Sequence, residues 1–141
     1  MECSMAEFKG ACLCGKIRYA ASAEPVFMAV CHCKDCQRAT GSAFEAVIGI
    51  PATSLTVHGT PRVFTVKGQS GQDVHRSFCP DCGSTMMLRL DARPGVVLLT
   101  TGVLDDPSGF KPTAQIFCDS AQPWVHLGGA MKRFPGAPSR G

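Results

Sequence analysis

The sequence has few charged residues and lacks any long hydrophobic run. Charged side chains make up 18% of the 141 residues, and no apolar run approaches the ~18 residues of a transmembrane helix. The segment Met1–Lys9 contains neither the basic region nor the apolar region of a secretory signal peptide. We therefore expect a cytoplasmic protein without a membrane partner.

Clusters of basic side chains are also missing. The formal net charge is +3, but the densest basic segment is the pair Lys132–Arg133. This charge counts every cysteine as neutral, and ionised cysteines would lower it. Such scattered basic residues predict no nucleic-acid partner.

Length and turn residues predict one mainly β domain. The chain is long enough for one domain and not comfortably for two. We assign the domain to residues 1–133 and expect 134–141 to form a flexible tail. The 15 glycines and 10 prolines separate short runs rich in Val, Ile, Phe and Thr, which predict antiparallel strands. The predicted elements are strands at Ile17–Ala21, Val26–Val30, Phe44–Ile50, Arg62–Lys67, Val74–Phe78, Thr85–Leu90, Val96–Thr101 and Thr113–Phe117, and one short helix at Lys34–Thr40, ended by Gly41.

Cysteine is the residue type in excess. The odd number of cysteines, nine, and the lack of a signal peptide favour metal ligands in a reducing compartment over disulfides. Seven of them fall in three short clusters, Cys12-Leu-Cys14, Cys31-His-Cys33-Lys-Asp-Cys36 and Cys79-Pro-Asp-Cys82. Three such clusters in one short chain predict zinc binding.

The spacing of the clusters suggests how they share metal ions. Cysteines two residues apart project to one face of an extended segment, so Cys12 and Cys14 can reach the same ion. The proline and glycine of Cys79–Gly83 favour a tight turn that presents its two cysteines beside them, giving a closed structural site. Three ligands then remain, Cys31, Cys33 and Cys36, and their open fourth position is typical of a catalytic zinc. The alternative is a fourth protein ligand, from His32, His58, His75, Cys3 or Cys118.

Longer motifs around the clusters resemble a known family. They are Gly10-Ala-Cys-Leu-Cys-Gly-Lys-Ile-Arg-Tyr19, Cys31-His-Cys-Lys-Asp-Cys-Gln-Arg-Ala-Thr-Gly-Ser-Ala-Phe44, Arg76-Ser-Phe-Cys-Pro-Asp-Cys-Gly-Ser84 and, more loosely, Lys111–Leu127. From about Gly10 to Leu127 the chain resembles the glutathione-dependent formaldehyde-activating enzyme family, which includes the centromere protein V relatives. The resemblance implies a β-tent fold, built of antiparallel sheets stapled by zinc.

The resemblance also implies a carbon–sulfur lyase-type reaction, in which glutathione and formaldehyde form S-hydroxymethylglutathione. It implies a structural zinc on Cys12, Cys14, Cys79 and Cys82, and a second, catalytic zinc on Cys31, Cys33 and Cys36. We expect this second ion to be held loosely. The expected glutathione contacts are Arg38, Gly41, Ser42 and Trp124. The sequence departs from the family at Gln115, where many members carry a histidine.

Three functional hypotheses follow. The first is an enzyme that joins glutathione, or a related thiol, to formaldehyde or a similar small aldehyde. The alternatives are a non-catalytic, zinc-stapled binding module and a thiol redox enzyme that uses Cys118 or a metal-free cluster of Cys31, Cys33 and Cys36. We expect His32 to point away from the metal, toward solvent or behind the ligands, because it alternates with them in an extended segment. For Trp124, packing inside the protein is the alternative to a place on a pocket wall.

Overall fold

The computed structural model describes residues 6–138 and contains two β-sheets. The smaller sheet has three strands in the order β1-β2-β5, and the larger has eight in the order β11-β10-β3-β4-β9-β8-β7-β6. The strands are β1 (Glu7–Ala11), β2 (Arg18–Ser22), β3 (Phe27–Cys31), β4 (Glu45–Pro51), β5 (Leu55–His58), β6 (Arg62–Lys67), β7 (Asp73–Phe78), β8 (Thr85–Leu90), β9 (Val96–Thr100), β10 (Ala114–Ile116) and β11 (Lys132–Arg133). The helices are α1 (Lys34–Thr40) and the 3-10 turns η1 (Ala52–Ser54), η2 (Thr101–Val103), η3 (Pro107–Gly109) and η4 (Cys118–Ser120).

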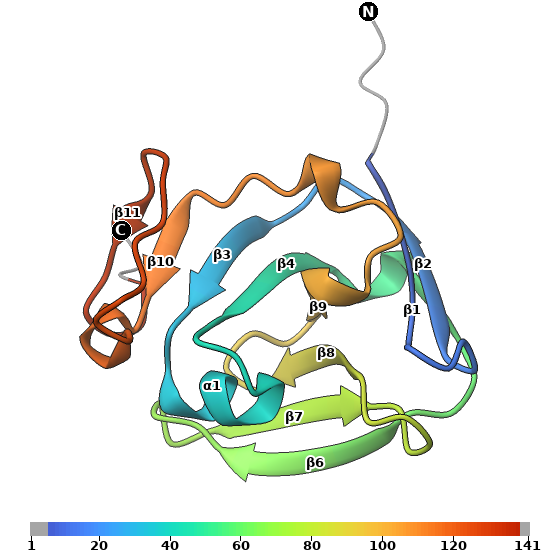
Figure 1. Ribbon diagram of the computed structural model, residues 1–141. Coiled ribbons are helices and arrows are strands. Elements are labelled where there is room, and N and C mark those ends of the chain that lie inside the picture. Colours follow the sequence, from blue (N-terminus) through green and yellow to red (C-terminus); the bar gives the residue numbers. More distant parts are fainter. Residues whose placement is uncertain (1–5, 139–141) are drawn as a thin grey trace, which may run out of the picture.

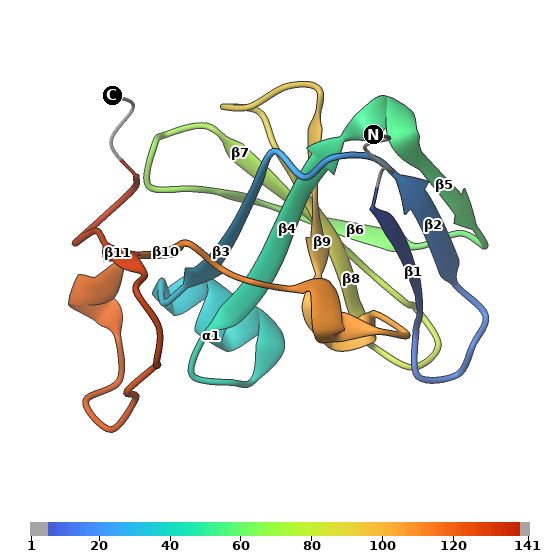
Figure 2. The same ribbon diagram turned by 90° about the horizontal axis from the view of Figure 1, so that it is seen from above.

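The mainly β class with one short α-helix is confirmed. Figures 1 and 2 show the small sheet on one side of the molecule and the C-terminal segment with β10 and β11 on the other, with β3 and β4 between them. The β-tent name and the predicted domain limits stay predictions. In the described part of the chain, no helix is both long and apolar enough to cross a bilayer.

Two features of the sheets differ from the prediction. Strands β1, β5 and β11 were not expected. Strand β1 carries Glu, Lys and Gly, which are poor strand formers, and only alternate residues of it are buried. Strand β10 runs parallel to both β3 and β11, although all strands were expected to be antiparallel. The long connection of residues 101–113 returns the chain to the β3 edge, so β10 enters the sheet in the direction of β3.

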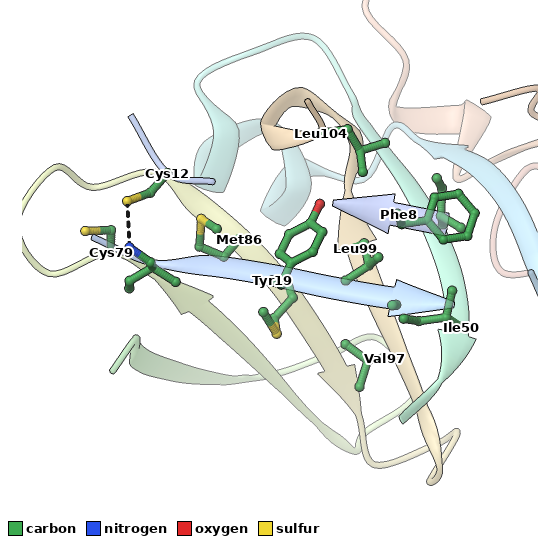
Figure 3. Packing of buried hydrophobic residues seen from close by; sticks show 13 residues of the cluster. Phe8, Cys12, Tyr19, Ile50, Cys79, Met86, Val97, Leu99 and Leu104 are labelled. Carbon is green, nitrogen blue, oxygen red and sulfur yellow. Dashed lines mark hydrogen bonds between the residues drawn. The ribbon is translucent and has the colours of Figure 1, made fainter. Parts of the chain in front are cut away.

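The main core lies between the two sheets and includes sulfur atoms of a cysteine cluster. Its members are Phe8, Cys12, Ile17, Tyr19, Ala21, Ile48, Ile50, Cys79, Met86, Met87, Val97, Leu99 and Leu104. In Figure 3, Cys12 and Cys79 lie at one end of this core, next to Met86, while Phe8 and Ile50 lie at the other. The Tyr19 hydroxyl donates a hydrogen bond to the Thr100 carbonyl at 3.3 Å, which joins the two sheets across the core.

Helix α1 begins and ends where the sequence predicts. The sulfur of Cys33 caps its N-terminus by accepting a hydrogen bond from the Cys36 backbone N–H at 3.3 Å. Gly41 ends it in the left-handed conformation, with φ of 67°, and its N–H donates to the Gln37 carbonyl. The helix buries Cys36 and Gln37, so one side of this short element faces the protein interior.

We expect Leu99→Ala to lower the free energy of unfolding by about 2–5 kcal/mol, because Leu99 is fully buried in the main core and its loss leaves a cavity. The matched control is Leu13→Ala, which makes the same change on a side chain that is 88% exposed. That control should change the free energy by less than about 0.5 kcal/mol. Chemical denaturation measures both, and equal effects of the two changes would contradict the assignment of the core.

Candidate metal centres and the adjoining cavity

The first cysteine cluster joins two turns that are distant in sequence. Cys12 and Cys14 follow β1, while Cys79 and Cys82 lie in the turn between β7 and β8. Their four sulfur atoms all lie within 4.8 Å of one another. The Cys12–Cys14 and Cys14–Cys79 sulfur distances are 3.6 and 3.7 Å. A tetrahedral zinc with Zn–S bonds of about 2.3 Å needs sulfur atoms about 3.8 Å apart, so this cluster fits zinc.

Backbone geometry supports the same cluster. Gly15 and Gly83 follow the last cysteine of each turn and adopt φ of 82° and 79°, which a side chain would disfavour. The Ile17 N–H donates to the Cys12 sulfur at 3.2 Å (the dashed line in Figure 3), which stabilises a thiolate there. Ser84 links the two turns, since its hydroxyl lies 3.3 Å from the Cys82 sulfur and accepts a hydrogen bond from the Leu13 N–H at 3.0 Å.

The second cluster has three sulfur atoms. Cys31 ends β3, Cys33 caps α1 and Cys36 lies in the first turn of α1, and their sulfurs lie within 4.8 Å of one another. Cys31 and Cys36 are buried and Cys33 is half-buried. In residues 6–138, no further His, Cys, Asp or Glu donor atom joins this group. The described residues therefore supply three ligands for a metal ion at this cluster.

The three sulfurs divide one negative charge unequally. Hydrogen bonds from Cys31 and Cys36 lower the pKa of Cys33 to about 2. The hydrogen bond with Cys33 raises the pKa of Cys31 to about 12, and hydrogen bonds with Cys31 and Cys33 also raise the pKa of Cys36. At neutral pH the metal-free cluster therefore holds a thiolate on Cys33 and protons on the other two sulfurs.

His32 lies between two ligands and is buried, with 1% of its surface exposed. The expectation that it faces solvent is wrong; it lies behind the ligands. Its Nε2 is 2.9 Å from Oε1 of Gln115, which also accepts a hydrogen bond from Arg133 at 3.3 Å. Since guanidinium only donates, this Gln115 atom is an acceptor and His32 Nε2 carries the proton. The imidazole of His32 thus lies beside Gln115, the position at which the resemblance led us to expect a histidine.

A chain of side-chain amides connects α1 to the C-terminal segment. Buried Gln37 donates from Nε2 to the carbonyls of His32 and Ser120, at 2.7 and 2.9 Å. Its Oε1 accepts from Gln122 at 3.0 Å, and Gln122 in turn accepts from the indole N–H of Trp124 at 2.6 Å. The sequence analysis missed both glutamines, because an isolated Gln carries no recognisable pattern. Together they hold the segment of Trp124 against α1.

A cavity of about 540 Å³ lies along α1. Its lining residues are Lys34, Gln37, Arg38, Gly41, Ser42, Ala43, Gln122 and Trp124. All four residues expected to contact glutathione therefore border one cavity. Trp124 is 69% exposed, so the alternative in which it packs inside the protein is wrong. The two charged lining residues, Lys34 and Arg38, are both cationic, which favours an anionic ligand.

The other candidate ligands lie elsewhere. His75 is held between Thr65 and Asp91, each at 2.9 Å. His58 ends β5. Cys118 donates a hydrogen bond to the Gln115 carbonyl at 3.5 Å and is not part of the three-sulfur group. Cys3 lies outside the described residues.

Comparison with known proteins identifies the family and a structure with the same fold. A family model described as glutathione-dependent formaldehyde-activating enzyme matches residues 7–120. The chain belongs to this family. No curated protein matches it. A crystal structure of a Rhodobacter sphaeroides protein shares the fold, with a TM-score of 0.56 at 20% identity, over 74% of this chain and 91% of that one.

We expect metal binding at the three-cysteine cluster to strengthen steeply with pH. A metal ion must displace the protons of Cys31 and Cys36, whose pKa values are raised, but finds Cys33 already ionised. The apparent dissociation constant should therefore fall about 100-fold per pH unit near neutrality, tenfold for each displaced proton. Titration against a chromophoric chelator at several pH values measures this slope. A pH-independent affinity would contradict the division of charge.

Proposed function

We propose that this protein joins glutathione, or a related thiol, to formaldehyde or a similar small aldehyde at a zinc ion on Cys31, Cys33 and Cys36. The reaction is of the carbon–sulfur lyase type: the thiol sulfur forms a bond to the aldehyde carbon, and the thiol proton ends on the aldehyde oxygen. The observation that carries the proposal is the cavity that borders α1 and collects all four expected glutathione contacts. The family supports glutathione and formaldehyde as the small molecules.

The metal set proposed here is two zinc ions. One, on the four-cysteine cluster, fixes the fold. The other would supply an open coordination position at which a thiol binds as its thiolate at neutral pH. We propose a cytoplasmic location, where glutathione is abundant and these cysteines stay reduced.

The residues of the cavity bind and orient the thiol. Lys34 and Arg38 are one helical turn apart on α1, so both side chains can meet the carboxylates of glutathione. Gly41 and Ser42 follow the helix at the cavity edge, where the Ser42 hydroxyl is a donor for the ligand. Their backbone N–H groups already donate to Gln37 and Thr40. The exposed indole of Trp124 forms a flat apolar wall whose position the amide chain fixes. Half-buried Cys33 is the ligand through which the cluster is most open to an entering sulfur.

A non-catalytic binding module is the second candidate. One observation favours it: none of the three cysteines lines the cavity, although Gln37, adjacent to Cys36 in the chain, does. In this case the cavity would bind an anionic small molecule without any contact between that molecule and the metal ion.

The deciding experiment combines metal analysis with formaldehyde–glutathione exchange measured by NMR. We expect about two zinc ions per chain and a faster exchange in the presence of the protein. Arg38→Gln should raise the KM for glutathione about 5-fold, with a smaller effect on kcat, since it removes a partly exposed charge contact of about 1 kcal/mol.

Arg89→Gln is the matched control, because Arg89 is an exposed arginine on β8 and does not line the cavity. If the protein binds two zinc ions tightly but does not change the exchange rate, the enzyme proposal is contradicted and the binding module is the remaining candidate.

A further inference from the structure

A buried arginine contacts the three-cysteine cluster from the large sheet. Arg76 lies on β7 and is 9% exposed. One end of its guanidinium, Nη1, donates to Oε1 of Glu45 at 3.3 Å, and the other, Nη2, donates to the sulfur of Cys36 at 3.6 Å. Glu45, at the start of β4, is 2% exposed and pairs with Cys31 in the register of β3 and β4. The guanidinium therefore connects three elements around the cluster.

The geometry is not that of an ordinary ion pair. An arginine whose role is to pair with a carboxylate usually donates to both of its oxygens. Here Glu45 Oε2 is buried and has no hydrogen-bond partner in the described chain, while the second guanidinium edge donates to sulfur. An unsatisfied buried acceptor is costly. The second edge of the guanidinium therefore does not serve the carboxylate, and it donates to the Cys36 sulfur instead.

We propose that Arg76 is a positioning residue for the second metal centre, holding the Cys36 sulfur with a charged N–H···S hydrogen bond, and that Glu45 aims its guanidinium. Three thiolates around one Zn²⁺ would leave a net negative charge on the cluster. The guanidinium of Arg76 places a positive charge next to one of these thiolates, that of Cys36. The inference rests on metal at the three-cysteine cluster, which is part of the proposed function. It does not depend on the identity of thiol or aldehyde.

The position of Arg76 also links the two metal centres. It precedes Cys79, a ligand of the four-cysteine cluster, by three residues on the same segment of chain. A second contact acts in the same region, because the Thr85 hydroxyl at the start of β8 donates to the Ala39 carbonyl of α1 at 3.2 Å. The closed cluster thereby holds the end of β7 in the place from which Arg76 reaches Cys36.

The test is a double-mutant cycle on Arg76 and Glu45 with cobalt(II) as the probe metal. Arg76→Gln should weaken cobalt binding at the three-cysteine site about 10–100-fold and shift its sulfur-to-cobalt charge-transfer band, because the sulfur loses its charged donor. The four-cysteine site of the same molecule is the internal control and should keep its affinity. Arg89→Gln, an exposed arginine on β8, is the matched surface control and should change neither site.

The double variant Arg76→Gln/Glu45→Gln separates the two roles of the guanidinium. If Arg76 acts on the Cys36 sulfur, the double variant still binds cobalt weakly at the three-cysteine site and keeps the shifted charge-transfer band. If Arg76 serves only to neutralise Glu45, removing both charges restores the wild-type affinity and band, which overturns the proposal.

Should Arg76→Gln fail to fold, Arg76→Lys decides, since it keeps the charge but not the two-edged donor. An affinity several-fold below wild type supports the proposal, and wild-type affinity with an unshifted band overturns it. No thiol or aldehyde is present in these titrations. A negative result in the cobalt titrations would therefore not contradict the proposed formaldehyde–glutathione exchange. A protein without exchange activity would likewise not contradict the role of Arg76.

Discussion

The contact among four cysteine sulfurs holds the two sheets of this protein in one arrangement. The turn after β1 belongs to the small sheet and the turn between β7 and β8 to the large one, yet their sulfurs lie within 4.8 Å. Four thiolates at this distance would repel one another, and a bound cation would offset that repulsion. A three-stranded sheet has little core of its own, and two of these sulfurs extend the core it shares with the large sheet.

The three-cysteine cluster depends indirectly on this arrangement of the two sheets. Its ligands lie on β3 and α1, but Glu45 of β4 and Arg76 of β7 support it from behind. The buried ion pair and the buried imidazole of His32 lie beside a cluster to which residues 6–138 supply three ligands, one fewer than a closed site has. Rigid surroundings suit an open metal site, because the protein then fixes three directions and leaves the fourth to a ligand.

The C-terminal segment completes the site by a different means. Strand β10 joins the sheet edge beside β3, and the amide chain from Gln37 to Gln122 ties the following segment to α1. Each amide group in this chain has a defined orientation, because hydrogen bonds engage both its nitrogen and its oxygen. The cavity that this segment helps to line carries the cationic side chains of Lys34 and Arg38 and lies along the helix that contains Cys36.

The sequence by itself determined the fold class, the helix from Lys34 to Gly41 and the grouping of cysteines, because turn residues, strand runs and ligand spacing are local patterns. Most predicted strands lie within one or two residues of the observed ones. Only the tertiary structure decided the parallel entry of β10, the burial of His32 and the contact of Arg76 with Cys36. These features join residues that are up to 85 positions apart, as the β3–β10 partners Ala29 and Ala114 are. The role of a buried polar side chain depends on its hydrogen-bond partner in the folded protein. Because that partner is distant in sequence, no local pattern predicts it.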